Sequence, residues 1–305
     1  MKKFIVIALV TFSFTIYGCM STPNRYGQLR AELQTYTDTL HAQIGIALLT
    51  DNGDSLTLHN HYHYEMMSVL KFHQALAVCD YLQRRALPLD TILHITADEL
   101  RPGTWSPLRD TYLQRKHTDE MNISVRSLLT YTLQQSDNNA CDILFNHLVS
   151  PAETDAFIRR FADTEDFGIV HTEAEMQEDL HLSEENWSTP YAAAILLKQF
   201  LETNLIKEPY KSFVKETMIA CQTGMTRLPA PLHNTSATIG HKTGSGYIAE
   251  DGRITATNDL GFIILPNGTR YILAVFVKDS RYDVPQTEKI IGHVSQIVFN
   301  HLQER

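Results

Sequence analysis

The stretch Ser68-Val69-Leu70-Lys71 stands at the start of the longest block with helical character in this sequence. If a helix begins there, Ser68 lies at the helix end whose unsatisfied N–H groups favour negative charge. Lys71 follows three residues later and faces the same side. A serine becomes nucleophilic when a neighbouring base takes its proton, and an amine can do so once burial or nearby cations lower its pKa. By itself the motif is weak evidence, because Ser-x-x-Lys is also common on solvated helices.

Working outward, the block from Ser68 to about Lys215 is predominantly helical, and strand patterns lie on both sides of it. The turn Asp51-Asn52-Gly53-Asp54 predicts a hairpin before the block, and Pro266-Asn267-Gly268 predicts a second turn after it. We expect helices over 28–41, 69–85, 125–132, 139–148, 189–201 and 286–302, and strands over 43–50, 55–59, 238–241, 259–265 and 271–278.

This order of elements predicts an α+β protein in which strands from both ends of the chain form one antiparallel sheet around a helical insertion. The 305 residues can bury a full core, as one large domain or as two closely packed halves. We place an α/β domain at 28–62 and 216–305, and an all-α domain at 63–215. The net charge of −9 and the lack of a basic cluster exclude a nucleic-acid partner.

The N-terminus is typical of an exported protein. Lys2 and Lys3 precede an apolar run over 4–17, which is too short for a comfortable membrane span, so we predict a signal peptide over 1–19. Two alternatives stay open at its end, because Gly18-Cys19 resembles a lipoprotein box but Tyr17 fits that box poorly. Cys19 is either the lipid-modified first residue or part of the removed segment. A polar tether over 20–27 follows, and the location is periplasmic or secreted.

The remaining cysteines show neither zinc nor redox spacing. If an anchor consumes Cys19, the odd count of Cys79, Cys141 and Cys221 excludes complete pairing, although one disulfide would be allowed in an oxidising periplasm. The prediction is small buried apolar side chains. We expect no metal site at three alternating histidines, which lack carboxylate or cysteine support: His59, His61 and His63.

Two further motifs carry chemistry, each with an ordinary structural alternative. In Ser136-Asp137-Asn138, the Ser136 hydroxyl can relay a proton and the Asn138 amide can hold a substrate carbonyl or amide. The alternative is an N-cap of the helix predicted from residue 139.

In Lys242-Thr243-Gly244, Lys242 supplies charge for a substrate carboxylate, and Thr243 supplies a hydroxyl donor. Gly244 leaves room for a ligand along an edge strand. The N–H groups of Ser245 and Ser68 could then form an oxyanion hole. The alternative is a plain glycine turn into Gly246.

The three motifs in this order form the signature of class A β-lactamases and penicillin-binding proteins. Along essentially its whole mature length the chain resembles class A serine β-lactamases, most closely the cephalosporinase branch of Bacteroides-like anaerobes. The stretches that carry the resemblance include Met66-Met67-Ser68-Val69, Thr104-Trp105-Ser106-Pro107, Gln135-Ser136-Asp137-Asn138-Asn139-Ala140 and His241-Lys242-Thr243-Gly244-Ser245-Gly246-Tyr247.

The resemblance implies a β-lactamase/transpeptidase-like fold, with a five-stranded antiparallel sheet flanked by helices, an all-helical domain and a cleft between them. It implies a monomeric hydrolase that confers antibiotic resistance by opening small-molecule β-lactams through an acyl-enzyme on Ser68, without a cofactor. Lys71 or Glu173 deprotonates Ser68, two alternatives that stay open. Ser136 passes a proton to the departing nitrogen, and Lys242 supports that transfer electrostatically.

The resemblance also selects residues that spacing alone does not. Among many acids after Gly168 it points to Glu173, on an omega-shaped loop, as the base of deacylation. Gln177 takes the place of an asparagine that helps hold the water. Trp105 matches an aromatic wall of the cleft. Arg227 matches an arginine that assists carboxylate recognition, with a surface arginine as the alternative.

Two departures from the family pattern stand out. His171 and Asn186 occupy the positions of the arginine–aspartate pair at the neck of the loop, and this joint change favours an altered loop over a broken ion pair. The segment between Trp105 and Ser136 is longer, with an insertion over 114–120.

Two rivals share the three motifs, a penicillin-binding DD-peptidase and a β-lactam sensor. Glu173 argues against the peptidase, and the lack of a transmembrane or signalling segment argues against the sensor.

Overall fold

A computed structural model describes residues 26–114, 120–161 and 166–303 of the chain. The signal peptide, Cys19, most of the tether and most of the 114–120 insertion therefore lie outside the described residues. Within the described residues, no helix is both long and apolar enough to cross a membrane.

A five-stranded antiparallel sheet joins the two ends of the chain, with strand order β2-β1-β10-β9-β8. The N-terminal strand β2 forms one edge of the sheet and pairs with β1. Strand β1 in turn pairs with β10, so that Gln43 lies opposite Lys278 and Thr50 opposite Tyr271. The predicted sheet from both chain ends is confirmed. Its strands are β1 (Gln43–Thr50), β2 (Ser55–Leu58), β8 (Thr238–Ser245), β9 (Ile254–Ile264) and β10 (Arg270–Ser280).

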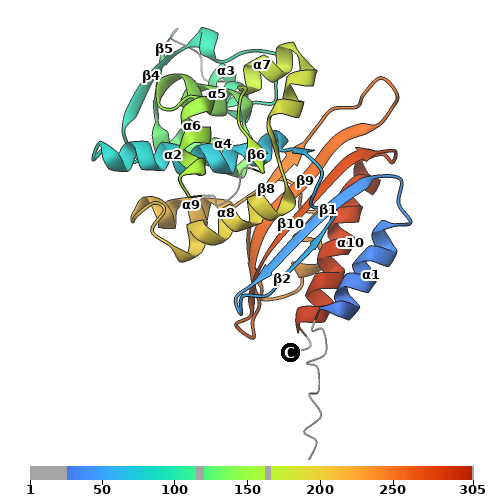
Figure 1. Ribbon diagram of the computed structural model, residues 1–305. Helices are drawn as coiled ribbons and strands as arrows, with labels where there is room; N and C mark the ends of the chain where they lie inside the picture. The colour runs from blue at the N-terminus through green and yellow to red at the C-terminus, as the bar shows by residue number, and fades with distance from the viewer. Residues whose placement is uncertain (1–25, 115–119, 162–165, 304–305) are drawn as a thin grey trace, which may run out of the picture.

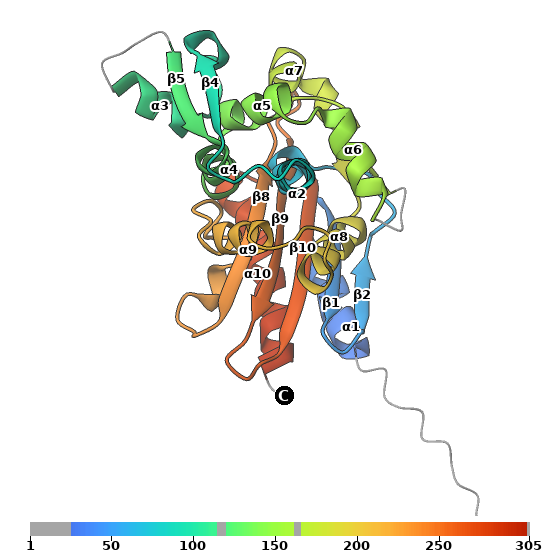
Figure 2. The same cartoon turned by 90° about the vertical axis from the view of Figure 1, so that its left-hand side faces the viewer.

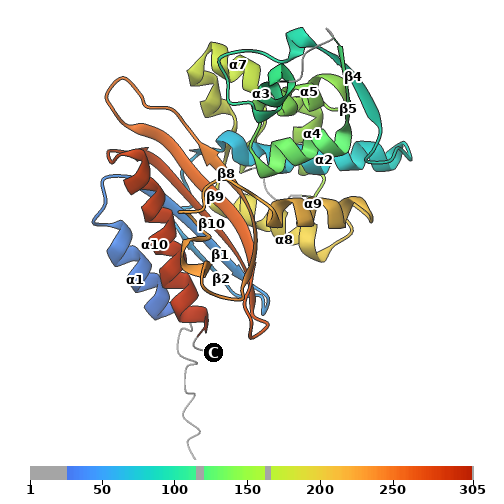
Figure 3. The same ribbon diagram turned by 180° about the vertical axis from the view of Figure 1, so that it is seen from behind.

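Helices cover both faces of this sheet (Figure 1). The first and last helices, α1 (Gly27–Thr37) and α10 (Val284–Gln303), pack together on one face, seen from behind in Figure 3. The other face contacts α8 (Pro190–Glu202) and α9 (Tyr210–Ile219). Successive side chains of a strand point to opposite faces, so Ile46 and Leu48 join one core and Ala47 and Leu49 the other. Strands buried on both sides therefore show continuous apolar runs rather than alternation.

The remaining helices lie beyond the end of the sheet, as Figures 1 and 2 show. They surround the buried α2 and share its core. These helices are α2 (Leu70–Arg84), α3 (Pro107–Gln114), α4 (Val125–Gln134), α5 (Asn138–His147), α6 (Pro151–Arg159) and α7 (Glu173–Glu178), with 3₁₀ turns η1 (Met67–Val69), η2 (Ala97–Glu99) and η3 (Leu180–Glu185). A further 3₁₀ turn, η4 (Ala230–Leu232), packs instead against α10.

This helical part also contains two small sheets, which the prediction of an all-α segment overlooked. One has the order β3-β7-β6 and the other pairs β4 with β5. Two-residue strands are too short to show a period of two, and β4 is largely exposed, so neither sheet leaves a clear pattern. The strands are β3 (Tyr64–Glu65), β4 (Ile92–Thr96), β5 (Glu120–Ser124), β6 (Phe167–Gly168) and β7 (Trp187–Ser188).

Candidate active site

Ser68 lies in the 3₁₀ turn η1, directly before α2. The sequence placed it at the first turn of an α-helix, but the α-helix begins at Leu70. Met67, the preceding residue, has a φ of +46°, a conformation that is strained for a side chain of its size. The turn brings the Ser68 hydroxyl to 2.8 Å from Lys71 Nζ, as the Ser-x-x-Lys spacing predicts.

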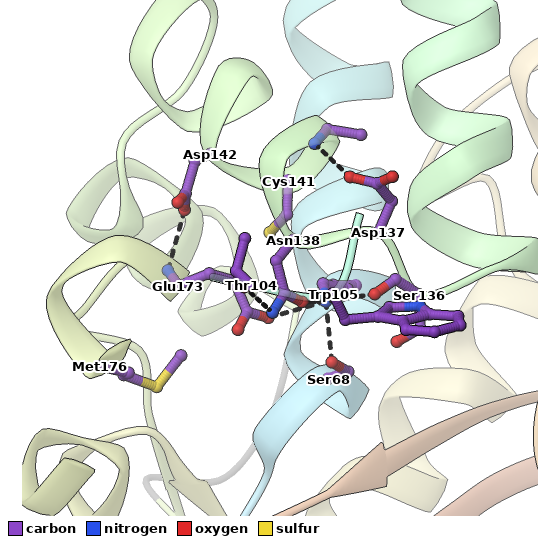
Figure 4. A network of polar contacts seen from close by, with 12 residues as sticks. Ser68, Thr104, Trp105, Ser136, Asp137, Asn138, Cys141, Asp142, Glu173 and Met176 are labelled. Carbon is purple, nitrogen blue, oxygen red and sulfur yellow. Dashed lines mark hydrogen bonds and ion pairs between the residues drawn. The ribbon is translucent and has the colours of Figure 1, made fainter. Parts of the chain in front are cut away.

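Lys71 is completely buried and is surrounded by four oxygens. Besides Ser68 Oγ, its Nζ lies 3.0 Å from the Ser136 carbonyl, 2.6 Å from Asn138 Oδ1 and 2.8 Å from Glu173 Oε1. An ammonium has three N–H donors, so one of the four contacts is a charge contact without a hydrogen bond of its own. Figure 4 shows Ser68, Ser136, Asn138 and Glu173 converging on this point from separate elements.

Ser136 and Lys242 form a second polar pair beside the first. Ser136 has a φ of +59°, and its hydroxyl accepts a 2.9 Å hydrogen bond from Lys242 Nζ. Burial, and then the neighbouring Lys71, lower the pKa of Lys242 to about 7. Between Ser136 and Asn138, the buried Asp137 accepts from the N–H of Ala140 and caps α5. The motif is therefore both a helix cap, through Asp137, and a source of cleft side chains.

Strand β8 runs directly against the turn that carries Ser68. A Cβ at Gly244 would collide with the Met66 carbonyl and would lie 3.3 Å from Ser68 N, so glycine is required for this approach. The strand extends to Ser245, beyond the predicted end at 241, because β9 pairs with the whole Lys-Thr-Gly segment. This pairing excludes the alternative of a plain glycine turn.

Arg227 is 4% exposed, which excludes the surface arginine. Its guanidinium donates to the Gly244 carbonyl at 2.9 Å and to Ser245 Oγ at 2.6 Å, and pairs with Glu288 at 2.9 Å. No local pattern pointed to Glu288, which lies 61 residues away on α10.

Residues of all three motifs line one cleft of about 420 Å³, whereas the fully buried Lys71 and Lys242 lie behind its lining. Its walls bring together the three motifs, Trp105 and Arg227. Trp105 is 61% exposed and donates to the Gln135 carbonyl at 2.8 Å, as expected of a wall at the cleft mouth. Gln177 is exposed and does not line the cleft; its amide faces the Cα of Gly103.

Comparisons with known proteins agree with this arrangement. A family model described as the β-lactamase enzyme family matches residues 28–302. A β-lactamase of Phocaeicola vulgatus is 40% identical over 86% of this chain and 81% of its own length. One of Bacteroides uniformis is 37% identical over 95% of this chain and 97% of its own. The crystal structure of a class A β-lactamase from Bacteroides cellulosilyticus superimposes with a TM-score of 0.86 at 31% identity, covering 92% and 99% of the two chains.

The chain belongs to the class A β-lactamase family. Its activity is hydrolysis of the β-lactam amide, and the predicted fold and family are confirmed.

The loop of this β-lactamase that carries Glu173 is fixed to the helical part by Asp142, which the sequence analysis missed. Asp142 Oδ1 accepts from the Glu173 N–H at 2.9 Å (Figure 4). Asp142 Oδ2 accepts from Arg101 at 2.8 Å. Burial, and then the charge of Glu173, raise the pKa of Asp142 to about 7. Spacing in the sequence could have pointed to Asp142, because it follows Asn138 by four residues on α5 and both side chains therefore face the same side of the helix.

At the neck of the loop the β-lactamase uses an amide in place of an ion pair. The buried Asn186 side chain accepts from Val170 N at 2.7 Å and from His171 N at 3.0 Å, and it donates to the His171 carbonyl at 2.8 Å. The Asn186 carbonyl also accepts from Met66 N at 2.7 Å, two residues before Ser68. The joint change at the neck is thus a backbone clasp, which we call the Asn186 clasp.

The three alternating histidines and the described cysteines are not among the residues that line this cleft. His59 contacts the Ile44 carbonyl, His61 lies against Tyr62, and His63 stacks on Trp187. No group of residues suited to a metal ion occurs in the described part of the chain. All described cysteines are buried and free: Cys79, Cys141 and Cys221.

Proposed function

We propose that this β-lactamase hydrolyses penicillins and cephalosporins through an acyl-enzyme on Ser68, with Glu173 as the base of deacylation. One observation carries the proposal. Lys71 Nζ lies 2.8 Å from both Ser68 Oγ and Glu173 Oε1, so nucleophile, amine and carboxylate form one proton-transfer chain. Each group is within hydrogen-bond reach of its neighbour before substrate arrives.

In acylation, Ser68 attacks the lactam carbonyl as its proton passes to Lys71 or, through a water, to Glu173. With a neutral Lys71 the lone pair of Nζ can accept the hydroxyl proton while its two N–H groups serve two of the three remaining oxygens. Both routes use the same three residues, and the geometry supports either one.

The developing oxyanion is held by the N–H groups of Ser68 and Ser245. Support comes from the approach of β8, which puts the Cα of Gly244 close to Ser68 N. Ser136 passes a proton to the departing lactam nitrogen, and the 2.9 Å contact with Lys242 Nζ assists that transfer. Because the pKa of Lys242 is about 7, this side chain can supply either a proton or a positive charge at neutral pH.

The substrate carboxylate lies near Thr243, Ser245 and Lys242, with Asn138 on the opposite wall. Arg227 acts mainly by fixing Ser245 and the β8 backbone, because its N–H groups are already engaged there and with Glu288. Gln177 has no support in the present geometry as a ligand of the deacylating water.

A chromogenic cephalosporin tests the proposal. Wild type turns over steadily, Ser68→Ala shows no reaction, and Glu173→Ala forms a lasting acyl-enzyme that adds the mass of the opened cephalosporin to the protein. Glu178→Ala, at an exposed position on the same helix, is the matched control and keeps its turnover. A wild type that labels once and stops would instead identify a DD-peptidase or a sensor.

We also propose the organisation expected from the sequence: a signal peptide within 1–19 that either leaves Cys19 as the lipid-modified first residue or is removed together with Cys19, export to the periplasm, an α/β domain at 28–62 and 216–305, a helical domain at 63–215, and a monomer. Intact mass of the exported protein distinguishes a lipidated Cys19 from a plain cut. Light scattering of the purified enzyme gives its oligomeric state, and a dimer would overturn that part.

A further inference from the structure

A thiol, an imidazole and a carboxylate lie together behind the cleft, and the proposed mechanism uses none of them. They are Cys221, in the segment after α9, His241 on β8, and Asp259 on β9. His241 Nδ1 lies 2.9 Å and 3.1 Å from the two oxygens of Asp259, and His241 also hydrogen-bonds the Cys221 thiol. Since Asp259 occupies Nδ1, the thiol meets the other ring nitrogen, Nε2.

This order of groups is the one that activates a thiol. A carboxylate holds the imidazole with a proton on Nδ1 and stabilises its cationic form, and the cationic imidazole then stabilises the thiolate. Burial alone would lower the pKa of His241, but Asp259 more than offsets burial and raises it to about 10. Burial alone would raise the pKa of Cys221, but its hydrogen bond to His241 and the charges of His241 and Lys242 bring it down to about 7.

The other described cysteines have the opposite surroundings. Cys79 and Cys141 are completely buried, and burial raises the pKa of both thiols. Cys221 is 8% exposed, and Thr223, two residues further on, lines the substrate cleft. The chain thus contains its own reference thiols for a test of reactivity.

We propose that Cys221, His241 and Asp259 form a reactive-thiol site, at which Cys221 is alkylated by small, soft electrophiles that arrive through the substrate cleft. The thiolate attacks the electrophilic carbon, a C–S bond forms, and the bond to the leaving group breaks with its electron pair. The thiol proton goes to solvent, and the cationic His241, paired with Asp259, stabilises the thiolate. The site is one of modification rather than of turnover.

Modification of Cys221 would disturb the β-lactam site through two neighbouring threonine side chains. Cys221 Sγ lies 3.5 Å from Thr223 Oγ1, and Thr223 Oγ1 lies 2.6 Å from Thr243 Oγ1. A group added to the buried sulfur has to displace Thr223, which shifts the wall that carries Thr243. We therefore expect the alkylated enzyme to lose β-lactam turnover.

Iodoacetamide tests the proposal on the folded enzyme, with peptide mapping by mass spectrometry to read each cysteine separately. Cys221 should be labelled before Cys79 and Cys141, with a rate whose midpoint lies near pH 7. An ordinary thiol, with a pKa of about 8.5, is only about 3% thiolate at pH 7, against about half for Cys221. Labelling of Cys221 that is no faster than that of Cys79 and Cys141, or has its midpoint at pH 8.5 or above, overturns the proposal.

Two variants distinguish the effect of the His241 imidazole on the thiol from the effect of the thiol's exposure. In His241→Asn the thiol keeps its burial but loses the neighbouring cation that stabilises its thiolate, so the midpoint should rise by at least about one pH unit and the rate at pH 7 should fall at least about fivefold. Asp259→Asn should move the midpoint in the same direction, and it serves if His241→Asn does not fold, as judged by circular dichroism. An unchanged midpoint in the folded variants contradicts the role of the pair.

The activity arm rests on the proposed function, whereas the labelling arm does not. Alkylated wild type should lose most of its cephalosporin turnover, and Cys221→Ser treated in the same way should keep the turnover it had before treatment. Full turnover after complete labelling of Cys221 overturns the coupling to the cleft. A wild type that is inactive before labelling would count against the proposed function and leave the labelling result to stand on its own.

Discussion

Replacing Asn186 by alanine removes the Asn186 clasp and tests whether it holds Glu173 in place. The change deletes three hydrogen bonds to the backbone, of 2.7, 3.0 and 2.8 Å, and a fourth to Met176 Sδ at 3.3 Å, and it leaves two backbone N–H groups and one carbonyl without their partner. An unsatisfied buried polar group costs about 1–3 kcal/mol. Val170 is 48% exposed, so water can replace part of what is lost there. We therefore expect a loss of about 2–4 kcal/mol in the free energy of unfolding.

Two measurements follow from that loss. Thermal unfolding by calorimetry should show a melting temperature lower by about 5–12 °C, at about 2–4 °C per kcal/mol for a chain of this size. Glu173 begins α7 two residues after His171, so its carboxylate should lose its position near Lys71. Misplacement by about 1 Å costs about 100-fold in rate. Deacylation should therefore slow by about 10- to 100-fold, and acyl-enzyme should accumulate in stopped-flow and mass measurements.

Two further variants interpret the result. Asn186→Asp keeps the acceptor for both N–H groups and loses only the donor to the His171 carbonyl, so its stability should fall between wild type and Asn186→Ala. Asn146→Ala, at an exposed position on α5, should leave melting temperature and deacylation unchanged. If the free energy of unfolding of Asn186→Ala lies within about 0.5 kcal/mol of the wild-type value and the variant deacylates at the wild-type rate, the Asn186 clasp does not position Glu173.

Three further changes probe the other parts of the site. With its pKa near 7, Lys242 loses its charge as pH rises through neutrality, so kcat/KM for a carboxylate-bearing cephalosporin should fall on the alkaline side with a midpoint near pH 7. Lys242→Arg should remove that limb, and an unchanged profile would exclude Lys242 as its source. Gly244→Ala forces β8 away from the Met66 carbonyl, so kcat/KM should fall at least about 100-fold and the free energy of unfolding should fall by about 1–3 kcal/mol. Wild-type kinetics in this variant would contradict the close approach of β8. Asp137→Ala removes the α5 cap and the 2.6 Å bond from Leu108 N, and chemical denaturation should show a loss of about 2–4 kcal/mol, whereas a loss below about 0.5 kcal/mol would show the cap to be dispensable.

Much of the fold is local enough to be predicted from the sequence. The bounds of β1 agree with the prediction at both ends, since an apolar run that stops at Asp51-Asn52-Gly53-Asp54 leaves little freedom. Helices α4, α5 and α8 start within one residue of their predicted starts, at residues that cap or precede regular apolar spacing. Where pairing decides the structure, prediction fails: β8 continues through Lys242 and Gly244 because β9 supplies hydrogen bonds along that whole segment.

The three motifs could be recognised from the sequence alone, because Ser-x-x-Lys, Ser-Asp-Asn and Lys-Thr-Gly each consist of residues that are close neighbours along the chain. The tertiary structure alone decided how they meet. Lys242 reaches Ser136 across 106 residues, and the Asn258 amide reaches the backbone beside Ser68 across 193 residues. Such contacts leave no local periodicity, since chain closure and not spacing brings them together. For the same reason the Asn186 clasp, Asp142 and the Cys221–His241–Asp259 cluster became visible only in the folded chain.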